Sequence, residues 1–417
     1  MDQGLKSLQE RGFLQQCTDI DAVTALLAKE PTSFYVGFDP TGSSLHAGHM
    51  VPLYAMVHLA RAGHKPIALI GGGTARIGDP SGKTEMRQML TVEQIQANAA
   101  SIRTQIETFL AGQGCEATVV DNSDWLANLN YIEFLRDIGR HFSVNRMLSF
   151  ETYKMRLETG LSFIEFNYQL LQSYDYLVLN RDHDCRLQVG GDDQWGNIVA
   201  GVDLIRRVSR KESYGLTFPL VTRADGKKMG KTEQGAVFLD PQMFSVYDFY
   251  QYWRNVPDPD VRKFLYLYTF LPNEEIEALS AHEGQELNAA KSRLAFELTR
   301  LVHGEEEAAT AEQAAAAAFG AGGTGSGDRS GIPSTKIPLA ELEAGIPVMD
   351  LFQRSGLCAS RSDARRLVEQ GGARVNEQKI ESLDELIGAN RLDKESTGEP
   401  ELLLRAGKKR YHRIIPV

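Results

Sequence analysis

The first two hundred residues alternate between short apolar runs and longer segments with helical spacing. The runs SFYVGF (33–38) and KPIALIGGG (65–73) have the composition of buried strands, and a helical pattern over 45–63 separates them. A helical pattern over 92–111 and a strand pattern beginning at 117 continue the series. This alternation predicts a mostly parallel sheet with helices on both faces, in which ligands bind beyond the carboxyl ends of the strands.

The pattern changes along the second half of the chain. A helix over 162–179 and a strand that runs into a glycine loop over 185–197 extend the α/β series, whereas the segment from about 245 to 319 is helical throughout. The stretch AGGTGSGDRSGIP is typical of a flexible linker. We therefore predict an α/β domain over 1–240, a helical domain over 241–320, a linker over 321–335 and a small α+β domain over 336–417.

The composition narrows the class of protein. With 42% apolar and 24% charged residues the chain is typical of a globular protein. No apolar run approaches membrane-spanning length and the polar start is unlike a signal peptide, so we expect no membrane partner. Four widely separated cysteines without a CxxC pair argue against a zinc site and a disulfide framework, and favour the cytoplasm. The net charge of −10 argues against a non-specific nucleic-acid coat.

Candidate chemistry begins in DPTGSSLHAGH (39–49). His46 and His49 are three residues apart and share one face of the helix that should follow, with Ser44 as its expected cap. That helix end offers unsatisfied N–H groups and a positive dipole to an anion, and Gly48 would let a ligand approach the backbone. The pair suits the phosphates of ATP, but two surface histidines or half of a metal site fit the residues as well.

A second candidate is GKKMGKT (226–232). It is similar to a phosphate-binding P-loop but has three residues instead of four between its glycines, and GDPSGKT (78–84) departs in the same way. Lys228 and Lys231 follow a predicted strand and lie on a connection, from which an ammonium group can follow a phosphate as its geometry changes. A solvated basic loop is the alternative.

Together, HAGH and KMGKT resemble the HIGH and KMSKS motifs of class I aminoacyl-tRNA synthetases. Ala47 takes the place of the isoleucine, and Gly230 and Thr232 take the places of the serines. Since none of the replaced groups carries a charge, we expect these changes to adjust the activity and not to abolish it. The chain resembles the bacterial tyrosyl-tRNA synthetase family nearly end to end, on five segments: FYVGFDPTGSSLHAGH, GDPSGKTEMR, FNYQLLQSYD, GGDDQWGN and DGKKMGKTEQGA. The resemblance implies a Rossmann-like catalytic domain and a homodimer.

A polar stripe on the helix over 162–179 gives the candidate amino-acid pocket. Tyr168, Gln172 and Asp175 fall at i, i+4 and i+7, which the residues alone leave as a solvated face or a lined pocket. The resemblance implies that Asp175 and Tyr35 meet a tyrosine hydroxyl, which would supply the donor that a buried carboxylate needs and would select against phenylalanine. It also implies that Asp79, Tyr168 and Gln172 hold the ammonium group and that Gln194 lies near the carboxylate.

The nucleotide half follows from the same resemblance. It implies that Asp193 binds the ribose of ATP and that Asp39 lies near the adenylate, while Gly48 and Gly191 allow close backbone approach. Capping or turn stabilisation is the alternative for Asp79 and Asp193. Mg²⁺ would enter with ATP, without a dedicated protein metal site. The residues implied at the reacting phosphates are Thr41, His46, His49, Lys83, Arg87, Lys228 and Lys231.

The C-terminal part differs from the rest in charge. Residues 346–417 carry 13 Lys and Arg against 11 Asp and Glu, a net of +2, which leaves −12 for the remainder of a chain with a total of −10. This part resembles an S4 RNA-binding domain, in which basic patches hold RNA phosphates. An ordinary solvated helix face is the alternative. The candidate RNA contacts are Arg361, Arg365, Lys408, Lys409 and Arg410.

Three rival functions compete with a tyrosine–tRNA ligase that uses ATP, L-tyrosine and tRNA(Tyr). Another HxGH nucleotidyltransferase would leave the polar stripe and the C-terminal domain unexplained. A tryptophanyl enzyme would place an indole N–H against an Asp/Tyr pair that suits a phenol better. An RNA-binding scaffold without catalysis would have lost its charged motifs, which are present here.

Overall fold

The computed structural model forms two compact units, the first comprising Met1–Asp240 and Pro257–Leu287, the second Pro241–Val256 and Asn288–Val417. The domain boundaries expected from the sequence stay a prediction. For Lys231, Thr232, 318 and 319 only the backbone is described. The residues that the structure describes are 2–81, 89–224, 226, 229–232, 235–319, 329–393, 400–407 and 410–417.

A six-stranded sheet forms the centre of the first unit, in the order β1-β6-β5-β2-β3-β4. All neighbouring strands are parallel except β1, which is antiparallel to β6. Because β2 pairs with both β3 and β5, the strand order reverses between β2 and β5, and the carboxyl ends there form the crevice in which such sheets bind ligands. The strands are β1 (Gln16–Cys17), β2 (Ser33–Phe38), β3 (Lys65–Ile70), β4 (Thr118–Asp121), β5 (Cys185–Gly191) and β6 (Tyr214–Phe218).

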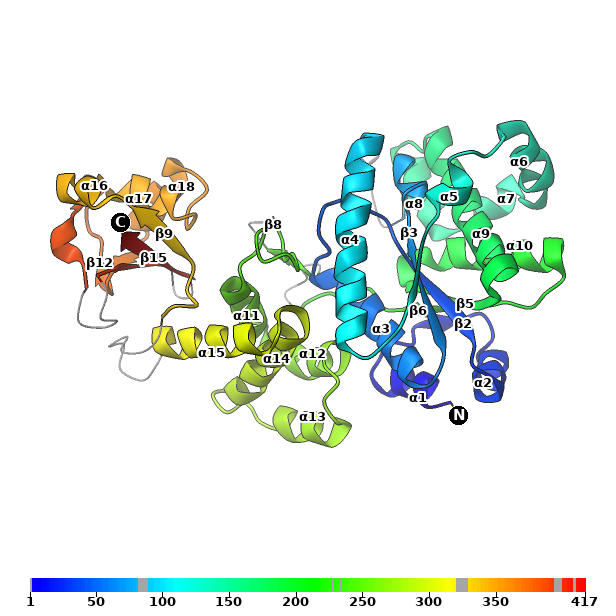
Figure 1. Ribbon diagram of the computed structural model, residues 1–417, viewed down its shortest axis with the longest axis horizontal. Helices are drawn as coiled ribbons and strands as arrows, with labels where there is room; N and C mark the ends of the chain where they lie inside the picture. Colours follow the sequence, from blue (N-terminus) through cyan, green and yellow to red (C-terminus); the bar gives the residue numbers. More distant parts are fainter. Residues whose placement is uncertain are drawn as a thin grey trace. The chain divides into compact units, whose positions relative to one another are not determined.

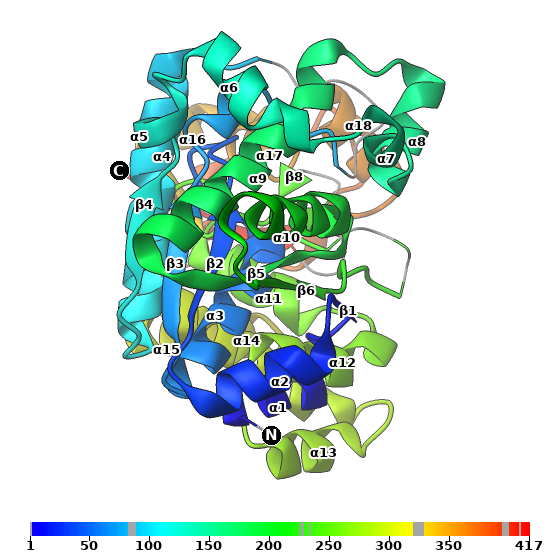
Figure 2. The ribbon, with the colours of Figure 1, turned by 90° about the vertical axis from the view of Figure 1, so that its right-hand side faces the viewer.

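Helices cover both faces of this sheet, as predicted (Figure 1). One face carries α3 (Met50–Arg61) and α4 (Val92–Gly112), and the other carries α9 (Phe163–His183) and α10 (Trp195–Ser209), which cross the sheet side by side (Figure 2). α3 is buried from Met50 to Leu59 because its apolar residues extend around the helix. The other helices of this unit are α1 (Gln3–Glu10), α2 (Ile20–Lys29), α5 (Ser123–Leu126), α6 (Tyr131–Asp137), α7 (Val144–Met147), α8 (Glu151–Thr159), α12 (Val261–Tyr268) and α13 (Asn273–Ser280).

The start of α3 differs from the expectation that Ser44 caps it. A short 3-10 turn, η1 (Ala47–His49), precedes the helix, and His46 caps this turn. The Gly48 N–H donates to His46 Nδ1 (3.0 Å), and the His46 N–H donates to His49 Nδ1 (3.1 Å). The Ser44 cap was therefore a wrong prediction, because the two imidazoles satisfy the N–H groups at this end.

The second unit joins a helical part to a small α+β part. Its helices α11 (Val246–Arg254), α14 (Leu287–His303) and α15 (Glu305–Phe319) come before residues 320–328, most of the predicted linker, which lie outside the described residues. Arg329 is only 5% exposed and donates to Glu401, so the packed chain resumes before 336. A five-stranded sheet follows, in the order β12 (Gln378–Lys379), β11 (Ala373–Val375), β14 (Leu402–Ala406), β15 (Arg410–Pro416) and β9 (Ser334–Ile337), with helices α16 (Leu339–Ala344), α17 (Val348–Arg354) and α18 (Arg361–Glu369).

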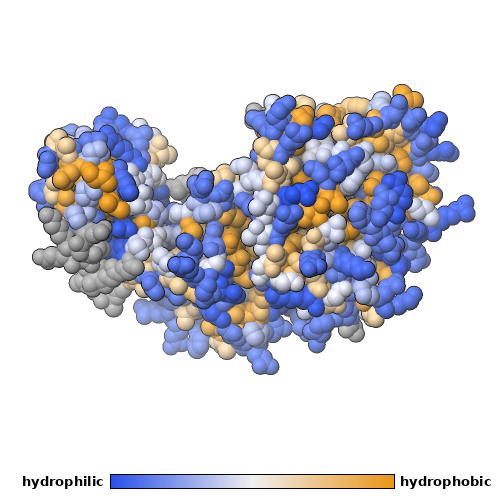
Figure 3. Space-filling view, in the orientation of Figure 1, coloured by the Kyte–Doolittle hydropathy of each residue, from blue (hydrophilic) through white to orange (hydrophobic). Residues whose placement is uncertain are grey.

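Part of the first unit exposes apolar side chains. Ile132 on α6 is 70% exposed and Phe163 at the start of α9 is 71% exposed. Between these helices lies a hollow of about 470 Å³ lined largely by apolar residues, among them Leu126, Phe134 and Leu171. Figure 3 shows hydrophobic residues that reach the surface in the region of α6 and α7. Along the described parts of the chain, no helix is both long and apolar enough to cross a membrane.

Candidate active site

Asp175 on α9 is 1% exposed. Its Oδ2 accepts a hydrogen bond from Asn122 Nδ2 (2.9 Å), and its Oδ1 accepts one from Trp125 Nε1 (2.7 Å). Burial raises the pKa of Asp175 to about 7; the two hydrogen bonds oppose this rise and the nearby carboxylates of Asp39 and Asp121 add to it. The carboxylate thus has two protein donors. The expectation that a ligand must supply its donor is therefore wrong.

Tyr35 lies on β2 and is 1% exposed. Its pKa is raised, first by burial and then by the charge of Asp175, because the two groups lie close together. Among the residues that the structure describes, none forms a hydrogen bond with the Tyr35 hydroxyl. A buried hydroxyl without a partner is costly, so this one suits a ligand that carries a polar group to it.

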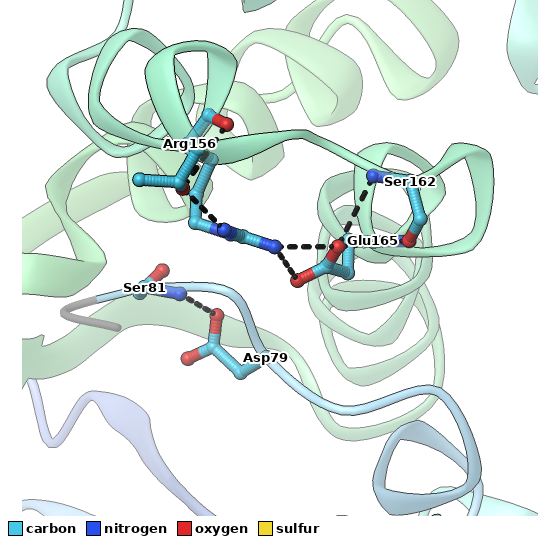
Figure 4. Close-up of polar contacts among 6 residues, drawn as sticks. Asp79, Ser81, Arg156, Ser162 and Glu165 are labelled. Carbon is cyan, nitrogen blue, oxygen red and sulfur yellow. Dashed lines mark hydrogen bonds and ion pairs between the residues drawn. The ribbon is translucent and has the colours of Figure 1, made fainter. Parts of the chain in front are cut away.

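The next polar network joins three of the predicted tyrosine-binding residues. Gln194 Nε2 donates to Asp79 Oδ2 (2.7 Å), and Asn197 Nδ2 donates to Gln172 Oε1 (3.2 Å) and to Gln194 Oε1 (3.1 Å). The Ser81 N–H donates to Asp79 Oδ1 (2.9 Å, Figure 4), so Asp79 stabilises a turn in addition to its bond with Gln194. The structure therefore brings Asp79, Gln172 and Gln194 together.

Tyr168 and Asp39, two further predicted site residues, form a second polar group. The Tyr168 hydroxyl donates to Asp39 Oδ2 (2.9 Å), and Thr74 Oγ1 donates to Asp39 Oδ1 (2.9 Å). Burial raises the pKa of Tyr168, and the charges of Asp39 and Asp79 raise it further. Gly71 is required beside this group, because a Cβ there would lie 1.9 Å from Asp39 Oδ1.

His46 and His49 present a pair of donors at the start of α3. Their rings stack with centroids 3.9 Å apart. Since each Nδ1 accepts a backbone N–H, a neutral ring carries its proton on Nε2 and can donate that proton to an anion. Thr41, also predicted here, is exposed and lies two residues after Asp39, to whose carbonyl oxygen its N–H donates (2.8 Å).

The loop after β5 carries Asp193 within a 3-10 turn, η4 (Asp192–Gln194). A Cβ at Gly191 would lie 2.7 Å from Asp193 Oδ1, so this glycine makes room for the carboxylate. Asp192 anchors the loop, because its Oδ1 accepts from Gln16 Nε2 (2.7 Å) and Thr217 Oγ1 (3.0 Å). Asp39 and Asp193 thus follow β2 and β5, the two strands at the switch point.

The basic residues of the site are described only in part. Lys83 and Arg87 lie in 82–88, outside the described residues, and so does Lys228. The backbone of Lys231 lies in β7 (Lys231–Thr232), which is antiparallel to β8 (Gly235–Ala236). No group of three or more His, Cys, Asp and Glu side chains that could hold a metal ion occurs among the residues described.

Two known protein families match successive parts of the chain. The family model of class I tRNA synthetases (W and Y) matches residues 27–320, and that of the tyrosine–tRNA ligase SYY-like C-terminal domain matches 329–414. The chain belongs to the tyrosine–tRNA ligase family. It is 59% identical over 415 residues to the tyrosine–tRNA ligase of Treponema denticola and 56% identical to that of Treponema pallidum, with 99–100% of each chain covered.

The fold of this ligase family is also found among solved structures. A C-terminally truncated mitochondrial tyrosyl-tRNA synthetase from Aspergillus nidulans superposes with a TM-score of 0.68 at 30% identity, covering 75% of this chain and 93% of that one. The fold class, the family and the enzyme class expected from the sequence are therefore confirmed. The roles of individual site residues stay predictions.

Sequence reasoning missed the residues that hold Asp175. Asn122 and Trp125 follow β4, and Asn122 Oδ1 also accepts the Gly73 N–H (2.7 Å). The available signal was position: DNSDW directly follows a predicted strand, at the sheet edge where Asp39 follows another. Polar residues after adjacent parallel strands lie close together.

A buried ion pair in this ligase was also unexpected. Arg156 on α8 donates through one nitrogen to both oxygens of Glu165 on α9 (2.8 and 3.0 Å), and both residues are 2% exposed. Burial alone would raise the pKa of Glu165, but its hydrogen bonds with Ser162 and Arg156 lower it overall. Figure 4 shows the pair facing the turn that carries Asp79. The pair joins α8 to the helix that carries Tyr168.

The predicted RNA contacts are spread over the small α+β part. Arg361 and Arg365 are both exposed on α18, and Arg361 Nε lies 2.8 Å from Asp350 Oδ1. Arg410 on β15 is half-buried, and burial lowers its pKa. Lys408 and Lys409 lie outside the described residues.

Proposed function

We propose that this ligase activates L-tyrosine with ATP, giving tyrosyl-adenylate and pyrophosphate, and then transfers the tyrosyl group to the 3′ end of tRNA(Tyr). The observation that carries the substrate choice is the unpartnered, buried Tyr35 hydroxyl beside the buried carboxylate of Asp175. A substrate phenol there donates to Asp175 and accepts from Tyr35. Phenylalanine would leave the buried Tyr35 hydroxyl without a partner, which is costly, and would offer no donor to Asp175.

The amino group and carboxylate of tyrosine occupy the opposite end of the pocket. The ammonium group is held by Asp79, Tyr168 and Gln172; Asp79 accepts a hydrogen bond from Gln194, and Tyr168 donates one to Asp39. An ammonium group in this position gains charge-assisted bonds to carboxylates already held in place by protein donors. Gln194 then lies near the substrate carboxylate, the nucleophile of the first step.

In that step a carboxylate oxygen of tyrosine attacks the α-phosphorus of ATP in line, and the bond to the leaving pyrophosphate breaks. No covalent enzyme intermediate and no general base are needed, so positioning and charge neutralisation supply the catalysis. The Nε2–H groups of His46 and His49 donate to the reacting phosphates, the charge of Lys231 helps to neutralise them, and Asp193 binds the ribose. ATP enters as its Mg²⁺ complex.

In the second step a ribose hydroxyl of the tRNA end attacks the tyrosyl carbonyl carbon, and AMP leaves. The small α+β part binds the tRNA through phosphate contacts, for which Arg361 and Arg365 are the best placed of the described candidates. Phosphate contacts of this kind weaken steeply with salt. The four cysteines are free thiols, which fits work in a reducing cytoplasm.

A second copy of the chain covers the apolar surface around α6 and the start of α9. The support is the exposure of Ile132 and Phe163 at the rim of an apolar hollow, since contiguous exposed apolar surface marks interaction sites. Light scattering should give the mass of a homodimer, and Phe163→Glu should shift it toward the monomer. An unchanged mass would remove this face from consideration.

The decisive test of the activity is ATP–pyrophosphate exchange with each standard amino acid in turn. Exchange should require tyrosine and be negligible with phenylalanine and tryptophan. Equal exchange with tryptophan would contradict the proposal, because an indole cannot replace the phenol between Tyr35 and Asp175.

A further inference from the structure

The segment after the lysine motif packs directly onto the histidine turn. The Ala47 N–H donates to the Val237 carbonyl oxygen (2.8 Å), and the Leu239 N–H donates to that of Leu45 (2.8 Å). The Val237 N–H in turn donates to the Gly230 carbonyl oxygen (2.9 Å). Val237 is fully buried. A continuous set of backbone hydrogen bonds thus connects Gly230 to the turn that presents His46 and His49.

Gly230 lies against this turn without a side chain between them. A Cβ at Gly230 would lie 2.9 Å from the backbone nitrogen of Gly48 and 3.4 Å from His46 Nδ1. These are the two atoms of the hydrogen bond that fixes the His46 ring (3.0 Å). Because backbone atoms cannot move aside as a flexible side chain can, any side chain at 230 would separate the two segments.

We propose that Gly230 is a positioning residue for the activation step: its missing side chain lets residues 229–232 and 235–239 dock on the histidine turn and sets the backbone of Lys231 beside it. On this proposal the loop docks before ATP binds, and is therefore prepared for the phosphates when they arrive. The serine that the KMSKS signature has at this place would disturb the arrangement here. This proposal rests on the proposed activation of tyrosine by ATP.

An alternative role for Gly230 is purely local, since its φ of +77° favours glycine in any case. Gly226, in the same loop, separates the two roles. Its φ is +78°, and a Cβ built there meets no atom within 4 Å. Gly226→Ala therefore carries the same backbone strain as Gly230→Ala but does not disturb the contact with Gly48.

The experiment compares full-length wild type with Gly230→Ala, Gly230→Ser and Gly226→Ala. Rapid-quench measurement of tyrosyl-adenylate formation at saturating tyrosine and ATP should show a loss of roughly a hundredfold for both Gly230 variants, the scale of an ångström-sized misplacement. Gly226→Ala should stay within about threefold of wild type. The Kd for tyrosine without ATP should be unchanged in all variants, because the hydrogen bonds described for Asp175 come from Asn122 and Trp125 and not from the described part of the loop.

Hydrogen exchange of the Ala47 and Val237 amides gives a readout that needs no reaction. Both amides should be protected in ligand-free wild type and in Gly226→Ala, and should exchange at least tenfold faster in Gly230→Ala. Wild-type rates of adenylate formation in Gly230→Ala, an equal loss in Gly226→Ala, or unprotected amides in wild type would each overturn the proposal. Should the Gly230 variants fail to fold, the exchange rates of the Ala47 and Val237 amides in wild type test the proposal: protected amides support the docked loop, and unprotected amides overturn it. A wild type that docks the loop but does not activate tyrosine would instead refute the proposed function.

Discussion

Replacing Trp125 by phenylalanine removes one of the two donors that hold the buried Asp175 carboxylate. The indole Nε1 lies 2.7 Å from Asp175 Oδ1, while Asn122 holds the other oxygen. A hydrogen bond to a charged group contributes about 1.5–3 kcal/mol, against about 0.5–1.5 kcal/mol for a bond to a neutral group. The difference, about 1–2 kcal/mol, acts on the ionised form of Asp175 alone.

Because only the ionised form of Asp175 is affected, the effect of the substitution on stability depends on pH. The pKa of Asp175 is raised from 3.8 to about 7, so the folded protein holds this proton more tightly than the unfolded chain does. The group's effect on stability therefore becomes less favourable as pH rises from about 4 to about 7, and constant above that. In Trp125→Phe the ionised form is less stable by about 1–2 kcal/mol, which raises the pKa of Asp175 by about one unit.

Two measurements follow from this reasoning. Urea unfolding at pH 6 and pH 8.5 should show a larger loss of stability for Trp125→Phe at the higher pH, by about 1–2 kcal/mol. Equilibrium dialysis should show tyrosine binding that strengthens above the pKa of Asp175, because charge-assisted hydrogen bonds are the stronger ones. The midpoint of that profile should lie about one unit higher in the variant.

Lost ring packing offers an internal control, because its cost does not depend on pH. An equal loss of stability at both pH values, with the same midpoint for tyrosine binding in both proteins, would refute the role given to the Trp125 hydrogen bond. A midpoint that moved to lower pH would refute the assigned sign.

Tyr35→Phe should keep or raise the free energy of unfolding, since it removes an unsatisfied buried hydroxyl, yet lower kcat/KM for tyrosine by about tenfold or more; a clear loss of stability would contradict the absence of a protein partner. Lys231→Ala should slow adenylate formation by roughly two orders of magnitude and leave tyrosine binding unchanged; weaker tyrosine binding would place this lysine in the amino-acid pocket. Arg156→Met should cost about 3–5 kcal/mol of stability by leaving Glu165 buried and unpaired, and adding Glu165→Met should restore much of it; equal losses in both variants would show that packing, not charge, dominates. Deleting 329–417 should spare pyrophosphate exchange and sharply reduce tRNA charging, since the basic residues of the α+β part are lost; unimpaired charging would remove that part from RNA binding.

The sequence predicted the sheet and its binding edge because hydrophobic runs and glycine turns report local structure. It placed Asp39 and Asp193 after strands that prove to be neighbours at the switch point. The partners of Asp175 lie about fifty positions away in the chain, and no local pattern joins them to it. The Arg156–Glu165 pair spans only nine positions and was missed for another reason, since an arginine in a polar helix predicts exposure. Only packing makes these groups neighbours.

The stacked histidines carry a consequence for acid conditions. Added positive charge at a phosphate site would ordinarily strengthen anion binding. Here each Nδ1 accepts a hydrogen bond from a backbone N–H of the turn. A proton on Nδ1 would make it a donor as well, and that hydrogen bond would be lost. Acidification should therefore loosen the turn and weaken ATP binding, and a titration calorimeter would register the fall. In the proposed reaction the start of α3 would therefore meet phosphate with a shaped array of donors that carries no net charge while each Nδ1 accepts its backbone N–H.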